Sequence, residues 1–133
     1  MSLYSTEYEI IIPFYDLDPM NVVWHGNYVK YMEKARCDLF SKLGYTYMDM
    51  KDDGYMYPVA KMTTKFIKSA RFDDVIVVKT SLLSVEPSLN MKYTILNKDN
   101  EKIFEAETMQ IAVNIDTEQS TYTAPPRLIA ILE

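Results

Sequence analysis

The segment from residue 16 to residue 28 combines acidic side chains, a histidine and the predicted start of a helix. Asp16 and Asp18 lie in a loop beside Pro19, and His25, the single histidine of the chain, follows seven residues after Asp18. A carboxylate can attack a carbonyl carbon or activate a water molecule. The first N–H groups of a helix lack acceptors within it and carry a partial positive charge, so they can stabilise an oxyanion. This spacing therefore indicates chemistry of the acyl-transfer type.

The three candidate groups have different expected roles. Asp18 is the predicted catalytic residue, and the sequence leaves open whether it attacks directly or deprotonates water. Asp16 is expected to be a hydrogen-bonding residue of the loop, since Asp favours turns. His25 could contribute its backbone N–H as an oxyanion donor. Its imidazole could orient water or a leaving group, or it could simply satisfy backbone groups at the helix start.

The bulk properties fit one domain over residues 1–133 and argue against several function classes. The chain has 48% hydrophobic residues and a formal net charge of −5, whereas a nucleic-acid-binding protein usually has a dominant basic field. No secretory signal and no apolar stretch near the length of a membrane span is evident. We therefore expect a cytoplasmic protein that does not bind nucleic acid and does not span a membrane.

The single cysteine, Cys37, is expected to be a buried structural thiol within a helix. One cysteine cannot form an intrachain disulfide, which suits a reducing compartment. One histidine without a Cys-x-x-Cys pair makes a zinc site improbable, and no phosphate-binding glycine motif is present. We expect no metal and no cofactor.

Two helices are predicted between the acidic loop and the later strands. Apolar residues recur at three- and four-residue steps over residues 26–43, which predicts a long amphipathic helix that Gly44 ends. Thr46 and Asp49 resemble a capping box for a second helix that ends near Gly54.

Alternating residues predict strands on both sides of these helices. One strand is expected to stop at Pro13, and four more follow, beginning with residues 60–66 and ending with a long strand over residues 103–115. The four later strands are expected to form a meander, and residues 125–132 a short closing helix. This order predicts an α+β fold in which an antiparallel sheet packs on one dominant helix.

The segment from Tyr15 to Tyr28, followed by Glu33 and Arg36 in the long helix, resembles the hot-dog-fold acyl-CoA thioesterases. The similarity is to the 4-hydroxybenzoyl-CoA thioesterase type and the Tol-Pal-associated acyl-CoA thioesterases. It implies a five-stranded antiparallel sheet wrapped around the long helix, a homodimer or a dimer of dimers, and active sites at the dimer interface. It also implies that Asp18 is the catalytic carboxylate and that the His25 N–H polarises the thioester carbonyl.

The resemblance also suggests substrate-binding positions. Tyr28 and Glu33 are candidates, although Tyr28 could be a core side chain and Glu33 could form a surface or interfacial ion pair. In the family, the region that corresponds to Tyr57, Pro58 and Val59 lines the acyl pocket and is contributed across the dimer; without the resemblance, these residues would simply be the entry to a strand.

A small basic cluster is the candidate site for CoA phosphates, since cationic side chains bind phosphate well. It consists of Lys65, Lys68 and Arg71. For each of these residues, a solvated strand edge is the alternative. The segment 86–88 has an acid and a proline where the aromatic-CoA branch has basic residues, so the nucleotide contacts are expected to differ. That branch also has a tyrosine at the position of His25, which favours the Tol-Pal-associated branch here.

The same residues are also compatible with two other functions. Acyl-thioester dehydratases share the fold but usually pair a histidine with an acid on another segment. A non-enzymatic acyl-CoA-binding protein would bind the thioester without releasing a thiol. The thioesterase hypothesis depends on Asp18 preceding the helix that begins after His25.

Overall fold

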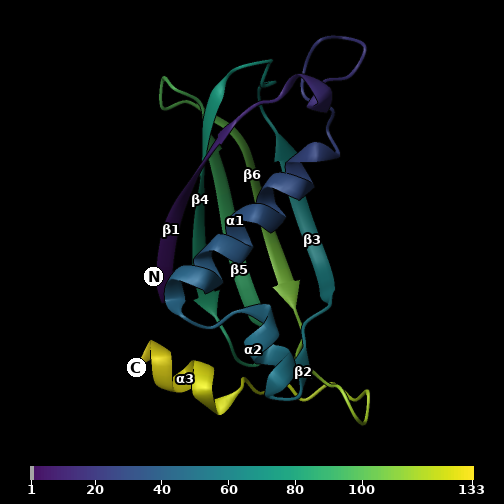
Figure 1. Cartoon of the computed structure of the whole chain (residues 1–133), viewed down its shortest axis with the longest axis vertical. Helices are drawn as coiled ribbons and strands as arrows, with labels where there is room; N and C mark the ends of the chain where they lie inside the picture. The colour runs from purple at the N-terminus through teal and green to yellow at the C-terminus, as the bar shows by residue number, and fades with distance from the viewer. Residues whose placement is uncertain (1) are drawn as a thin grey trace.

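A five-stranded antiparallel sheet wraps around one long helix in the computed structural model, which describes residues 2–133 (Figure 1). The strands lie in the order β1-β4-β5-β6-β3. Their bounds are Tyr4–Ile11 for β1, Val59–Phe66 for β3, Val75–Ser84 for β4, Leu89–Leu96 for β5 and Lys102–Gln110 for β6. The architecture is the predicted hot-dog arrangement, an α+β fold.

Helix α1 (Asn27–Leu43) crosses one face of the sheet (Figure 1). Its sheet-facing positions follow the predicted period, and Tyr28, Met32, Ala35 and Leu39 are all buried. Gly44 ends the helix with a φ of 88°, a left-handed conformation that glycine adopts without a Cβ clash. Burial of this apolar stripe against the sheet is the main stabilisation of the helix.

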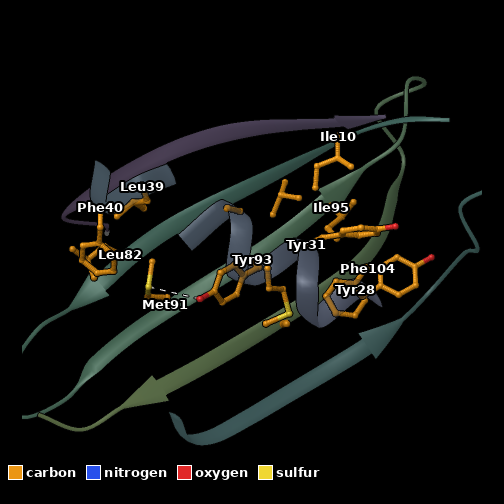
Figure 2. Packing of buried hydrophobic residues seen from close by; sticks show 14 of the residues in the cluster. Ile10, Tyr28, Tyr31, Leu39, Phe40, Leu82, Met91, Tyr93, Ile95 and Phe104 are labelled. Carbon is orange, nitrogen blue, oxygen red and sulfur yellow. Dashed lines mark hydrogen bonds between the residues drawn. The ribbon is translucent and has the colours of Figure 1, made fainter. Parts of the chain in front are cut away.

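The core fills the space between α1 and the inner face of the sheet, as Figure 2 shows. The ring of Tyr28 stacks on Phe104 of β6, with centroids 5.0 Å apart and an interplanar angle of 11°. Tyr31, Leu39 and Tyr93 are also almost completely buried. The N-terminal half of α1 is thereby packed against β6.

Smaller elements close the other end of the sheet. Helix α2 (Tyr47–Asp52) begins with the predicted capping box of Thr46 and Asp49. Strand β2 (Tyr55–Met56) pairs with β7 (Val113–Asn114) in a separate two-stranded sheet. Helix α3 (Pro126–Leu132) follows near the C-terminus, close to α2 in Figure 1. Within residues 2–133 no helix has the length and apolar character required to cross a bilayer.

The prediction of a four-stranded meander was wrong. Only β4, β5 and β6 follow one another as neighbours, whereas β3 pairs with β6 at the edge of the sheet. Helix α2 and β2 lead the chain past the sheet before β3 enters it, so sequence order and spatial order differ. All eight residues of β3 are exposed.

Two local predictions were also wrong. The long strand predicted for residues 103–115 ends at Gln110, because the chain leaves the main sheet and pairs with β2 at Val113. Cys37 is exposed rather than buried, since it lies on the side of α1 opposite the apolar stripe.

Candidate active site

The loop before α1 places Asp18 in a tight, hydrogen-bonded turn. The Asp18 N–H donates to the Val22 carbonyl at 2.8 Å, and the Asn21 N–H donates to the Asp18 carbonyl at 3.0 Å. Asn21 has a φ of 62°, a left-handed conformation in which Asn is enriched. A bridge between Leu17 and Val23 closes the base of the turn.

The Asp18 carboxylate keeps one oxygen available. Its Oδ1 accepts a hydrogen bond from the Met20 N–H at 2.8 Å. Within residues 2–133, no group donates to Oδ2. One oxygen therefore fixes the orientation of the side chain, and the other can act on a substrate or a water molecule.

The start of α1 offers a free donor close to this turn. The Asn27 N–H bonds to the Trp24 carbonyl at 2.9 Å, and the Tyr28 N–H bonds to the His25 carbonyl at 3.3 Å. The His25 N–H has no acceptor in the part of the chain that the structure describes. The first turn of α1 also lacks an acidic side chain, so no carboxylate of the helix neutralises its positive end.

Asp18 and His25 line the same cavity, which has a volume of about 320 Å³. The turn supplies Met20 and Val22, and the helix supplies Tyr28. The opposite wall comes from the end of β3 and the segment after it. The cavity is lined by Asp18, Met20, Val22, Val23, His25, Tyr28, Phe66, Ile67, Lys68 and Ser69. A carboxylate, a helix N-terminus and an apolar wall are thereby brought together.

Aromatic contacts hold the two walls of this cavity in place. The Phe66 ring lies 5.6 Å from the Tyr28 ring and 5.2 Å from the Phe104 ring, both near edge-to-face. The His25 imidazole meets the same ring edge-on at 6.3 Å. The Tyr28 hydroxyl accepts a hydrogen bond from the Ala70 N–H at 3.1 Å. Tyr28 is thus both a core residue and part of the cavity wall.

Glu33 is separate from this cavity. Its side chain is 49% exposed and forms an ion pair with Arg36. This is the surface ion pair that the sequence offered as the alternative to substrate binding. Arg36 itself is 3% exposed, and its guanidinium donates to the Tyr93 hydroxyl at 3.3 Å. The sequence pattern did not reveal that an arginine faces the sheet.

The segment from Tyr57 to Val59 lies at the opposite end of β3 from Phe66. Tyr57 is 8% exposed and lines a second, apolar cavity of about 320 Å³ with Tyr47 and Met50 among its neighbours. Pro58 and Val59 are exposed. None of the three lines the Asp18 cavity of its own chain.

The predicted basic cluster is divided between different surfaces. Lys65 lines a hollow with Lys92 and Glu105. Lys68 lines the Asp18 cavity and pairs with Glu101 on the surface. Arg71 is exposed and lines neither space. Lys65 lies within β3 and points to the face opposite Phe66, whereas Lys68 and Arg71 lie beyond the end of the strand.

Sequence reasoning missed the wall formed by Phe66, Ile67 and Ser69. The alternation of β3 indicated that Phe66 shares a face with Met62. It did not reveal that the strand lies beside β6 at the sheet edge, with its end next to the start of α1. Only the pairing of strands far apart in the sequence brings this segment to Asp18.

Comparison with known proteins identifies relatives over most of the chain. The family described as the thioesterase-like superfamily matches residues 12–132. The acyl-CoA thioester hydrolase YbgC of Shigella flexneri is 29% identical over 100 residues, which cover 74% of this chain and 75% of that protein. The structure is similar to a DHNA-CoA thioesterase from Staphylococcus aureus, with a TM-score of 0.81, 31% identity, and coverage of 89% of this chain and 80% of that one.

A further structural match supports the fold alone. It is a mutant 4-hydroxybenzoyl-CoA thioesterase in complex with 4-hydroxybenzoyl-CoA. The TM-score is 0.84 at 19% identity, and the match covers 98% of this chain and 99% of that chain.

Proposed function

The chain belongs to the thioesterase-like superfamily and is an acyl-CoA thioesterase, and we propose that Asp18 and the His25 N–H carry out the hydrolysis. The observation that carries this proposal is the cavity that Asp18 and His25 both line: Asp18 has an available carboxylate oxygen, and the His25 N–H at the helix start has no acceptor among the described residues.

In the proposed reaction, the His25 N–H acts on the thioester carbonyl oxygen, and the Asp18 carboxylate acts on the carbonyl carbon or on the attacking water. The thioester carbonyl oxygen accepts a hydrogen bond from the His25 N–H, which stabilises the negative charge that develops there. Asp18 either attacks the carbonyl carbon to give an acyl-enzyme anhydride that water then hydrolyses, or removes a proton from an attacking water. In both routes the C–S bond breaks, and the free acid and CoA thiol are released. A removed donor of this kind costs about 2.7–4 kcal/mol in other acyl-transfer enzymes.

We propose that Lys68 contacts the CoA phosphates. Its side chain is 54% exposed at the rim of the Asp18 cavity, and its present partner Glu101 is also exposed. Replacing the Glu101 carboxylate by a CoA phosphate as the partner of Lys68 costs little free energy, because an exposed ion pair contributes about 0–1 kcal/mol to stability. Arg71, three residues further on, is available for the same ligand.

A homodimer that pairs along β3 would complete the site. Among the described residues, β3 pairs only with β6, so its other edge is available to a second copy. The apolar side chains of Met62 and Phe66 are 42% and 52% exposed on this strand. An antiparallel, two-fold pairing sets the beginning of one β3 beside the end of the other. The segment from Tyr57 to Val59 of one copy would then face the Asp18 cavity of its partner.

A thiol-release assay over short, medium, long and aromatic acyl-CoAs tests the function. Hydrolysis of at least one class is expected. Conversion of a 3-hydroxyacyl thioester to an enoyl product would instead identify a dehydratase, and tight binding without release of thiol would identify a binding protein.

Sedimentation measurements test the dimer. The parent is expected to have the mass of a dimer or a dimer of dimers, and Met62→Asp is expected to shift it toward the monomer, because it places a charge in the interface. A parent that remains monomeric at all concentrations would refute the interface.

A further inference from the structure

Asp16 is the most deeply buried carboxylate near the Asp18 cavity, at 3% exposure, and it does not line that cavity. Its side chain accepts two hydrogen bonds from α1, one from the Lys30 ammonium at 2.8 Å and one from the Tyr31 hydroxyl at 2.7 Å. Burial by itself would raise the pKa of Asp16, but these hydrogen bonds and the charge of Lys30 outweigh it and lower the pKa. The carboxylate is therefore a charged anchor on the helix.

The backbone of Asp16 makes a second pair of contacts. Its carbonyl accepts from the Trp24 N–H at 3.0 Å and from the Asn27 side-chain amide at 2.8 Å. Trp24 immediately precedes His25, and Asp16 lies two residues before Asp18. Asp16 thereby connects the segment before Asp18 with the segment before His25, and connects both with the first turns of α1.

We propose that Asp16 is a positioning residue that holds the Asp18 carboxylate and the His25 N–H in register with each other, an inference that rests on the proposed function. Asp16 does not touch the substrate in this scheme. Its role is to fix the loop, since a displacement of about 1 Å in a catalytic group can cost about 100-fold in rate.

Asp16→Asn is the direct test, because it retains the shape of the side chain but replaces one acceptor by an NH₂ donor. This donor would face Lys30 or Tyr31, which are themselves donors. Tyr31→Phe is the second variant and removes a single hydrogen bond from the same carboxylate. Asp38→Asn is the matched control, since Asp38 also pairs with a lysine of α1, Lys42, at 2.9 Å.

Two measurements distinguish positioning from a general loss of stability. In variants that circular dichroism shows to be folded, we expect kcat to fall about 10- to 100-fold with little change in KM for Asp16→Asn. Tyr31→Phe is expected to show a smaller fall of the same kind. Trp24 is the only tryptophan in the chain, so its emission spectrum reports the loop directly and is expected to change in both variants but not in Asp38→Asn.

The outcomes separate this inference from the function on which it rests. Full kcat and an unchanged Trp24 emission in folded Asp16→Asn would overturn the positioning role while the thioesterase function stands. A fall in kcat that only follows the fraction of unfolded protein would overturn it as well. A parent that hydrolyses no acyl-CoA would overturn the proposed function, and the positioning role with it.

Discussion

A rise in pH above 10 is expected to unfold this protein over a narrow range, because folding takes several tyrosine side chains out of water. Burial is the largest cause of a raised pKa in six of them, and for Tyr47 the pKa reaches about 12. The six are Tyr28, Tyr31, Tyr45, Tyr47, Tyr57 and Tyr93. The folded protein therefore keeps protons that the unfolded chain loses near pH 10.

The sign and size of the effect follow from this difference. Above a pH of about 10 the folded state binds more protons than the unfolded state, so the free energy of unfolding falls as the pH rises. Each such tyrosine contributes about 1.4 kcal/mol per pH unit, and six together contribute up to about 8 kcal/mol per unit. A domain with a typical stability of about 5–15 kcal/mol would unfold within about one to two pH units above 10.

Urea unfolding at intervals between neutral pH and pH 11, followed by circular dichroism, measures this slope. Tyr57→Phe is the informative variant, since the buried Tyr57 hydroxyl has no hydrogen-bond partner among residues 2–133. The variant should reduce the slope by about 1.4 kcal/mol per pH unit and should not destabilise the protein at neutral pH.

Ile76→Val is the control. It shortens a completely buried side chain and should lower the free energy of unfolding by about 0.5–1.5 kcal/mol at every pH, with no change of slope. A free energy of unfolding that stays constant between pH 9 and pH 11 would refute the reasoning.

Three further predictions concern the residues that shape the site. Because folding lowers the pKa of Asp16, this carboxylate stabilises the folded state at a pH above its ordinary pKa near 3.8, and the stabilisation is lost as the pH falls. The difference in unfolding free energy between the parent and Asp16→Asn should therefore shrink in acid. Gly26→Ala places a Cβ 2.2 Å from the Trp24 ring, so tryptophan emission should change and turnover should fall; an unchanged spectrum would show that the ring does not pack there. Tyr28→Phe leaves the buried Ala70 N–H without an acceptor and should cost about 1–3 kcal/mol in urea unfolding; equal stability would contradict the contact.

Much of the fold could be predicted from the sequence because its signals are local. The three- and four-residue spacing of Tyr28, Met32, Ala35 and Leu39 identifies the buried face of α1. The capping box at Thr46 and the glycine stop at Gly44 depend on neighbouring residues only. These features needed no knowledge of the tertiary structure.

The partners of β3 could not be predicted in the same way. Its alternating residues indicate a strand, but the choice between β4 and β6 as its neighbour depends on how α2 and β2 direct the chain. This choice determines which residues face Asp18, so Phe66 was missed and Lys65 was grouped with Lys68. Cys37 was predicted to be buried because free cysteines usually are, whereas the spacing of the apolar residues places it on the opposite side of α1, where it is exposed.

The loop before α1 was partly predictable. The types and spacing of Asp18 and His25 indicated their shared chemistry, and they line one cavity. Asp16 was expected to be a hydrogen-bonding residue, and it is one. The identity of its partners depends on the fold of the loop over the helix, which spacing does not specify.

The turnover of Asp18→Asn, measured by thiol release beside Asp38→Asn, tests the central proposal most directly. Asn retains the shape of the side chain but can neither attack as a carboxylate nor accept a proton from water. We expect kcat to fall by about 10²- to 10⁴-fold in a variant that remains folded, while Asp38→Asn keeps the parent rate. Hydrolysis by Asp18→Asn at the parent rate would contradict the account.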